Sequence, residues 1–497
     1  MRLFVVAFAV LSTGACGGGS DSNAPVAPPP PPTMSIQVPA VVVTAGTLPA
    51  TASVGNSTTP TVTWSSDSPG VATVGSDGTI TGVSPGQSLI RATSGSLTAS
   101  ASVNIIPRFT ELGLGIRWGC GITAAADLYC WGLDTQDQLG VIEGRAACPL
   151  QPSNTCVQTP HQNSAALPFV RVNGGFQNTC GLTASGQGYC WGGNFDCAAP
   201  DPTFPKCGWL GAAASYRTPL KVSGELQLTS IGAGGDFVCM LTDAGAAYCL
   251  GINLSGILGT AATQRCGIAV AAYACSDTAI AISGGISFAS LSVGAAQVCG
   301  LTAAGAAHCW GANGNGQAGI GASGPNLTTP TAVVGGLQFS LISAGTSCFV
   351  ADPCGYHTCA ITAAGQAYCW GFNGYGELGN ASTVDSYVPV AVSGGLTFSS
   401  ISVGGAHTCG LTTSGRAYCW GFNTRGSLGD GTNTNRSVPT PVARSIAFAQ
   451  LDSRANLSCG RTASGTIYCW GNNAFGQLGA GLSSVLSVNT PVGIGVP

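Results

Sequence analysis

Seven copies of one cysteine motif constrain this chain more than any other feature of its sequence. In each copy nine residues separate two cysteines, and Trp-Gly usually follows the second one. Successive first cysteines lie 60, 59, 60, 60, 50 and 50 residues apart. Because a fixed period of this length is typical of solenoids, propellers and other arrays, the repeats decide the fold. The motif pairs Cys120 with Cys130, Cys180 with Cys190, Cys239 with Cys249, Cys299 with Cys309, Cys359 with Cys369, Cys409 with Cys419 and Cys459 with Cys469.

Each motif predicts a β-hairpin closed by a disulfide. In the copy at 359–369, Gly365 stands where a left-handed residue would close a three-residue connection, and counting outward pairs Cys359 with Cys369. The first copy has Ala126 in place of this glycine, so we expect a strained or different turn there. The nine-residue spacing is longer than that of zinc sites, which favours a disulfide. Each bridge stabilises its hairpin by roughly 2.5–3 kcal/mol on the chain-entropy model.

Composition and cysteine count narrow the class of protein. Charged residues make up 7% of 497, the net charge is −3, and the 16 basic residues form no run, so nucleic acid is a poor candidate partner. No apolar run reaches the eighteen residues of a membrane-spanning helix. Besides the repeat pairs and Cys16, eight of the 23 cysteines remain, and they form four neighbouring pairs. About eleven local bridges predict an oxidising compartment. The four extra pairs are Cys148 with Cys156, Cys197 with Cys207, Cys266 with Cys275 and Cys348 with Cys354.

The N-terminal residues predict export. Residues 1–16 carry Arg2, a short apolar run and small residues before Cys16, a pattern that resembles a bacterial lipobox in which this cysteine is lipidated. Thr13 departs from the leucine of that pattern, so cleavage and release is the alternative. Residues 17–33 are rich in glycine and proline and predict a tether.

Residues 34–106 predict a small β-sandwich. The apolar side chains alternate at Leu97, Ala99, Ala101, Val103 and Ile105, and turn residues punctuate the segment. The string VTWSSDSPGVATVGSDGTITGVSPGQSLIRATSG resembles the bacterial immunoglobulin-like group 2 family. The resemblance implies a spacer or adhesion module of a surface protein, and we interpret this one as a stalk.

Residues 108–497 hold the repeats and predict four short strands per unit. The units that begin at Trp370 and Trp470 read Trp-Gly-x-Asn-x-x-Gly-x-Leu-Gly and resemble the regulator of chromosome condensation repeat family. The resemblance covers all seven units and implies a seven-bladed propeller. We therefore predict an all-β chain, an immunoglobulin-like sandwich followed by a seven-bladed β-propeller. The nucleotide exchange activity known in that family is disfavoured, because an exported protein does not meet its cytosolic or nuclear partner.

The sequence contains no recognisable catalytic constellation. It lacks HExxH, GxSxG and P-loop motifs, so it predicts a protein without enzymatic activity, resident metal or cofactor. His357 and His407 share one repeat position and predict buried blade residues, whereas His308 and His161 lie elsewhere. A hydrolase or lyase site assembled across blades stays open as an alternative.

Strand order places the four extra cysteine pairs on one face of the predicted ring. If the strands of a blade are called A to D, antiparallel succession puts the A–B and C–D connections on one face and the B–C and D–A connections on the other. Three extra pairs follow the C strand and one precedes the B strand, so all four insertions share a face, where binding loops are commonly found. The candidate residues are Cys148, Cys156, Cys197, Phe204, Cys207, Trp209, Cys266, Tyr273, Cys275, Cys348, Phe349 and Cys354.

Together these features predict a monomeric, exported binding protein, tethered to the bacterial envelope through Cys16 or released from it. Its propeller would present the insertion-bearing face to an unidentified protein or glycan. Two alternatives remain, an exported enzyme with a site in the propeller axis and a structural or adhesive envelope component. Membrane contact is expected through the lipid anchor only.

Overall fold

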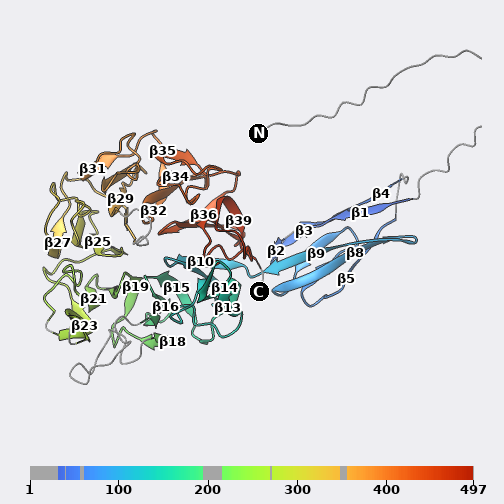
Figure 1. Cartoon of the computed structure of the whole chain (residues 1–497), viewed down its shortest axis with the longest axis horizontal. Coiled ribbons are helices and arrows are strands. Elements are labelled where there is room, and N and C mark those ends of the chain that lie inside the picture. The colour runs from blue at the N-terminus through green and yellow to red at the C-terminus, as the bar shows by residue number, and fades with distance from the viewer. Residues whose placement is uncertain are drawn as a thin grey trace, which may run out of the picture.

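The computed structural model describes residues 32–39, 41–55, 61–193, 215–262, 264–268, 271–346 and 355–495. Within these ranges every regular element is a β-strand. The strands form a sandwich and a ring of seven blades, and the sandwich projects from the rim of the ring (Figure 1). The predicted fold class, a sandwich followed by a seven-bladed propeller, is confirmed.

The sandwich buries its core between two sheets, of strand order β2-β9-β8-β5 and β3-β7-β6, while β1 pairs with β4. Ile80, Ile90 and Val103 are completely buried between them. The predicted alternation is visible in β9, whose side chains are half-buried and exposed in turn from Leu97 to Ser102. The strands are β1 (Met34–Gln37), β2 (Val41–Val43), β3 (Thr47–Pro49), β4 (Thr51–Val54), β5 (Thr63–Ser66), β6 (Ala72–Val74), β7 (Thr79–Gly82), β8 (Gly86–Ser94) and β9 (Leu97–Ile106).

Each blade of the ring is an antiparallel sheet with strands A to D from the axis outward. The A strands are β10 (Phe109–Leu114), β15 (Phe169–Gly174), β19 (Leu228–Ala233), β24 (Ser290–Val293), β28 (Leu341–Ala344), β32 (Phe398–Val403) and β36 (Phe448–Arg454). The B strands are β11 (Trp118–Thr123), β16 (Asn178–Thr183), β20 (Phe237–Thr242), β25 (Gln297–Leu301), β29 (His357–Ile361), β33 (His407–Thr412) and β37 (Leu457–Thr462).

The C and D strands complete the blades. The C strands are β12 (Leu128–Leu133), β17 (Gly188–Gly193), β21 (Ala247–Ile252), β26 (Ala307–Gly311), β30 (Ala367–Gly371), β34 (Ala417–Gly421) and β38 (Ile467–Asn472). The D strands are β14 (Gln151–Gln162), β18 (Ser215–Lys221), β23 (Ala271–Ala281), β27 (Leu327–Ala332), β31 (Ser386–Ala391), β35 (Arg436–Pro441) and β39 (Ser487–Gly493). Blades 1 and 3 each add an outermost strand, β13 (Arg145–Cys148) and β22 (Gln264–Ile268).

The B–C hairpins have the register expected from the cysteine motif. In blade 5 Cys359 lies opposite Cys369, and the two sulfurs form a disulfide. The turn closes with Gly365 in the left-handed region, at φ 79°. Ala126 adopts the same conformation in blade 1, at φ 65°, so the first hairpin keeps the turn type and accepts the strain of a Cβ there.

The equivalent disulfide forms in all seven blades, between the first and second cysteine of each motif. In every case the two cysteines lie directly opposite each other in the ladder of the B and C strands. Besides the bridge of blade 5, the disulfides join Cys120 to Cys130, Cys180 to Cys190, Cys239 to Cys249, Cys299 to Cys309, Cys409 to Cys419 and Cys459 to Cys469.

One position of the A strands links the blades around the axis. It is the position opposite the first cysteine of the motif, and in five blades its side-chain oxygen accepts a hydrogen bond of 2.8–3.1 Å from a backbone N–H of the next blade. Glycine holds the position in the other two blades, where a Cβ would collide with the neighbouring A strand. The five polar residues are Asn173, Ser292, Ser343, Ser402 and Asp452, and the glycines are Gly113 and Gly232.

The ring closes by contact between blades 7 and 1, and each blade is built from one continuous segment of the chain. The first A strand and the last D strand share one apolar cluster, to which Phe109, Leu114, Val492 and Ile494 contribute. The two ends of the repeat region therefore meet in adjacent blades, with no strand exchanged between them.

The sandwich is seated on this same seam. Ile106 is completely buried and, with Val43, packs against the cluster that closes the ring. The N–H of Phe109 donates to the carbonyl of Gly465 in the B–C turn of blade 7, at 3.0 Å. The sandwich therefore joins the ring on the face that carries the B–C turns.

Candidate binding face

The repeated Trp-Gly-x-Asn segment folds into a turn that its own asparagine holds. Asn373 Oδ1 accepts a hydrogen bond from the N–H of Leu378 at 2.9 Å, and Asn423 does the same for Leu428 at 3.0 Å. Because both side chains are completely buried and engaged with local backbone, they serve the fold and offer nothing to a ligand.

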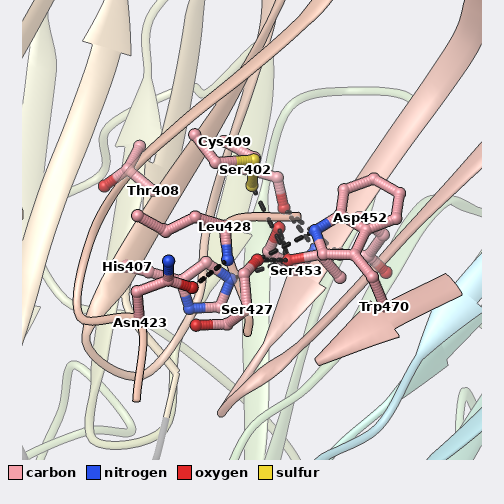
Figure 2. Close-up of a disulfide and its surroundings, with 12 residues drawn as sticks. Ser402, His407, Thr408, Cys409, Asn423, Ser427, Leu428, Asp452, Ser453 and Trp470 are labelled. Atoms are coloured by element: carbon pink, nitrogen blue, oxygen red, sulfur yellow. Dashed lines mark hydrogen bonds between the residues drawn. A yellow bond between two sulfur atoms is a disulfide. The ribbon is translucent and has the colours of Figure 1, made fainter. Parts of the chain in front are cut away.

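In five of the seven blades the motif tryptophan donates a hydrogen bond to a backbone carbonyl of the blade before it. Trp470 Nε1 donates to the carbonyl of Ser427 in blade 6 at 2.9 Å, and that carbonyl also accepts from Ser458 Oγ at 3.0 Å (Figure 2). A Cβ on Gly429 would lie 2.7 Å from the Trp470 Nε1 atom, which explains the glycine of the Leu-Gly pair. The tryptophans thus pack between blades. Equivalent bonds are made by Trp131, Trp310, Trp370 and Trp420.

Two of the four histidines lie at these contacts between neighbouring blades. His357 Nε2 lies 2.7 Å from Thr408 Oγ1, and His407 Nε2 lies 2.8 Å from Ser458 Oγ. Burial lowers the pKa of His357 to about 3 and that of His407 to about 4, so both rings are neutral near pH 7.

The other two histidines also have structural neighbours. His308 packs edge-to-face on Phe288, and His161 Nδ1 lies 2.9 Å from the carbonyl oxygen of Thr159. Among the residues that the structure describes, no three His, Cys, Asp or Glu side chains gather as metal ligands would.

The axis of the propeller holds a cavity of about 140 Å³ that is capped at one end. The guanidinium of Arg454 in blade 7 donates to Asn173 Oδ1 in blade 2 at 3.3 Å. The N–H of Ala455 donates to Thr346 Oγ1 in blade 5 at 3.1 Å. Both bonds span blades that are not neighbours, so the cap lies where the A–B connections converge on the axis.

The strand order decides on which face of the ring each predicted insertion lies. We call the face of the A–B and C–D connections the insertion face, and the opposite one the turn face. The disulfide between Cys148 and Cys156 follows the C strand of blade 1, and Cys275 follows that of blade 3. Both insertions are strands that widen their blade, where the sequence suggested loops. Cys148, Cys156 and Cys275 are buried, so they support the insertions and do not themselves touch a partner.

The remaining candidates of the predicted face are largely outside the described residues. Cys266 and Tyr273 lie in β22 and β23, whose backbone is described there. The candidates outside the described ranges are Cys16, Cys197, Phe204, Cys207, Trp209, Cys348, Phe349 and Cys354.

Exposed apolar side chains of the propeller loops are concentrated on the insertion face. Among the described loops of the propeller, five large apolar residues with exposed side chains stand in C–D connections, and one, Val334, stands on the turn face. Exposed apolar groups gathered on one face are typical of interaction surfaces. The five are Ile142, Leu150, Leu254, Val384 and Leu486.

A pocket of about 470 Å³ opens on the insertion face at the seam between blades 7 and 1. The A–B connections of both blades, the tip of the stapled hairpin and the C–D turns of blades 6 and 7 form its walls. Arg117 lies over the ring of Phe475, with its guanidinium carbon 4.2 Å from the ring centroid. Sequence reasoning missed this pocket, because its residues come from separate blades and those within the Trp-Gly-x-Asn segments occupy the variable positions of that motif.

The described residues contain no helix long and apolar enough to cross a membrane. A ring of blades with polar and apolar loops concentrated on one face is the architecture of a binding scaffold.

Family models match both parts of the chain. The Regulator of chromosome condensation (RCC1) repeat matches residues 364–411 and 414–461, and a second model of this repeat matches 398–427 and 455–477. The Bacterial Ig-like domain (group 2) matches 32–105. The scaffold therefore consists of RCC1 repeats behind a bacterial Ig-like domain, as the sequence predicted.

Curated relatives share part of this pattern. The chain is 28% identical over 293 residues to the RCC1 domain-containing protein RUG3, mitochondrial, of Arabidopsis thaliana, covering 56% of this chain and 58% of RUG3. It is 31% identical over 124 residues to the Ultraviolet-B receptor UVR8 of the same plant, covering 24% and 26%. The chain thus spans little more than half of one relative and a quarter of the other.

Solved structures match the propeller fold. Human WBSCR16 aligns with a TM-score of 0.60 at 18% identity, over 75% of this chain and 94% of that one. Prp20p of Saccharomyces cerevisiae aligns with a TM-score of 0.56 at 17% identity, over 69% and 80%. At these identities the likeness concerns the fold.

Proposed function

We propose that this is an exported envelope protein, lipid-anchored at Cys16, whose propeller presents its insertion face to a protein or glycan partner. The observation that carries the proposal is the one-sided distribution of added structure. The stapled hairpin of blade 1, the widened blade 3 and the five exposed apolar loop residues all belong to the insertion face. Rigid scaffolds that bind partners commonly do so through such loops.

Known RCC1 propellers support a protein-binding role. The structure of Prp20p was described with its binding properties to Gsp1p and histones, and yeast RCC1 was solved bound to Kap60. We extend from these proteins only the mode of action, a propeller face that docks onto another macromolecule. The bacterial Ig-like domain and the disulfides support an extracellular or envelope location.

The position of the sandwich supports the proposal that the insertion face is the binding surface. It joins the ring on the turn face, where Val43 and Ile106 pack on the apolar cluster of blades 7 and 1, and so leaves the insertion face uncovered. Strand β1 begins at the end of the sandwich that is far from the ring (Figure 1). A tether at residues 17–33 would therefore attach far from the proposed binding surface.

Partner capture tests the proposal. Immobilised protein is exposed to the surface fraction and medium of the source organism, and a variant with Ile142→Asp, Leu254→Asp and Val384→Asp is compared with Val334→Asp on the turn face. Both variants change exposed side chains, so both should keep the melting temperature. We expect a saturable partner that the triple variant loses and the control retains.

Replacing residues 197–207 and 348–354 by short linkers should also abolish capture. Capture that survives both changes but fails in the control would place the functional face on the other side. Turnover of a polymer would instead favour the alternative of an exported enzyme, and absence of any saturable partner would favour a structural or adhesive role.

A further inference from the structure

We propose that the pocket at the seam of blades 7 and 1 binds an acidic sugar unit of an envelope or extracellular glycan. This inference rests on the proposed function, since it places a glycan contact on the insertion face. It adds a defined site and a ligand class. The pocket measures about 470 Å³, within the range of roughly 300–1,000 Å³ that is usual for small-molecule sites.

Two arginines line the pocket. Arg117 comes from the A–B connection of blade 1, and Arg425 comes from the C–D turn of blade 6. Among the described residues that line the pocket none is acidic, although the whole chain has 19 acidic and 16 basic residues. Guanidinium groups bind carboxylates with paired hydrogen bonds, so this lining suits an anionic ligand.

One of the two arginines is held in place before any ligand arrives. The guanidinium of Arg117 lies 4.2 Å from the centroid of the Phe475 ring, and that ring is itself largely buried. Stacking on an aromatic face restricts the rotation of a long side chain, which reduces the entropy lost on binding.

The remaining polar residues suit hydroxyl groups. Five amide side chains line the pocket, and an amide can donate and accept hydrogen bonds, as a sugar hydroxyl also does. The oxygens of Asn472 and Gln477 already accept from the backbone N–H groups of Ala474 and Phe475, so these two amides would act as donors to a ligand. Seven of the twelve lining residues are amides or arginines, a composition that suits a hydroxylated and charged ligand better than the apolar anchor side chains of a peptide. The amides are Gln151, Asn154, Asn456, Asn472 and Gln477.

The stapled insertion of blade 1 forms one wall of the pocket. Its tip contributes Gln151 and Asn154, while the disulfide between Cys148 and Cys156 packs against Phe475 in a small apolar cluster. The bridge therefore supports both the wall and the ring on which Arg117 rests. Added structure on this face thus has a use that the sequence alone did not reveal.

Calorimetric titration of the folded protein tests the assignment. The probes are disaccharides that carry glucuronate, galacturonate or sialate, the methyl ester of the galacturonate disaccharide, a neutral galactose disaccharide, and a pentapeptide with a free C-terminal carboxylate. The variants are Arg117→Gln and Arg425→Gln, with Arg416→Gln as the matched control in a B–C turn on the turn face.

We expect at least one acidic disaccharide to bind. If the galacturonate disaccharide binds, its methyl ester should bind at least tenfold more weakly. Each pocket variant should lose at least tenfold in affinity, and Arg416→Gln should lose none. Added salt should weaken binding by the wild-type chain. Unchanged melting temperatures would show that the losses are local.

Failure of every acidic disaccharide, equal affinity for acid and ester, or full affinity in both pocket variants would overturn the assignment. Binding of the pentapeptide alone would replace the glycan by a protein carboxylate. Failure here remains distinct from failure of the proposed function. A partner that the wild-type chain and both pocket variants capture equally would leave the insertion face in use and the pocket without this role.

Discussion

Asp452 Oδ2, in the innermost strand of blade 7, accepts a hydrogen bond of 2.8 Å from the backbone N–H of Leu114 in blade 1. This bond is the inner link that joins blade 7 to blade 1, between residues 338 positions apart in the chain. Burial raises the pKa of Asp452, while the charge of Arg454 opposes that shift. This buried carboxyl group therefore contributes to the closure beside the two hydrogen bonds of Gln450 with Leu112 and the apolar cluster of the seam.

Replacing Asp452 by alanine should lower the free energy of unfolding by about 1–3 kcal/mol, because the Leu114 N–H loses its buried acceptor. Asp452→Asn keeps an acceptor oxygen and should lose less. Chemical denaturation monitored by tryptophan fluorescence measures both. Equal losses in the two variants would mean that charge, and not this hydrogen bond, matters at the closure.

Removing residues 488–497 should lower the melting temperature clearly and promote aggregation. The deletion takes Val492 and Ile494 out of the closing cluster and leaves the edge of β38 unpaired. Differential scanning calorimetry and light scattering check this, with removal of residues 17–31 as a control that spares every repeat. An unchanged melt would show that the ring closes elsewhere.

Glu377→Gln should stabilise the protein above mildly acidic pH. Burial raises the pKa of Glu377 to about 8, from 4.5 for a free side chain, so between these values the folded state holds a proton that the unfolded chain releases. Stability contributed by this group is therefore lost as pH rises from about 4.5 to 8. Glutamine already stands at this position in blades 1, 4 and 7 and makes the same bond to backbone N–H.

The difference in unfolding free energy between Glu377→Gln and the wild-type chain should be small near pH 4.5 and reach the order of 2–4 kcal/mol near pH 8. Taking the difference at each pH removes the effects of the buried histidines, which are common to both proteins. A difference independent of pH would show that Glu377 is not protonated in the folded state.

Ala126→Gly should raise the free energy of unfolding by about 1 kcal/mol, because it relieves a left-handed alanine. The gain is partly offset by the greater freedom of glycine in the unfolded chain. Gly186→Ala, at the matching turn of blade 2, should destabilise the fold instead. Thermal melts of the two variants and the wild type measure both effects. A loss of stability in Ala126→Gly would show that Ala126 is not strained in the wild-type turn.

Intact mass before and after alkylation should show no free thiol in the mature chain. The seven hairpin disulfides and the Cys148–Cys156 bridge account for sixteen cysteines of the described residues. The mass of the N-terminal peptide would reveal acylation of Cys16. Several alkylated cysteines in native material would argue against an oxidising compartment.

The sequence predicted the features that depend on residues close together in the chain. The register of Cys359 against Cys369 follows from a turn of three residues, and the blade follows from four such segments in succession. The contacts between blades could not be predicted in this way, because each tryptophan and the carbonyl that accepts its hydrogen bond belong to different repeats. Trp131 and the carbonyl of Gln477 are 346 positions apart.

The pocket was hidden for the same reason. Arg117, Arg425 and Phe475 come from three blades and occupy positions that vary in kind from one repeat to the next. Only closure of the ring brings them together. Strand parity placed the hairpin of blade 1 among the C–D connections, and the strand order of blade 1 agrees with that placement.

The seat of the sandwich has a mechanical consequence. Val43 and Ile106 press on the same apolar cluster that holds blades 7 and 1 together. A pulling force on the N-terminal end of the sandwich would therefore reach the propeller first at its own closure. Such a load would pass through the contact between blades 7 and 1, and a partner bound across that seam would hold the two blades together.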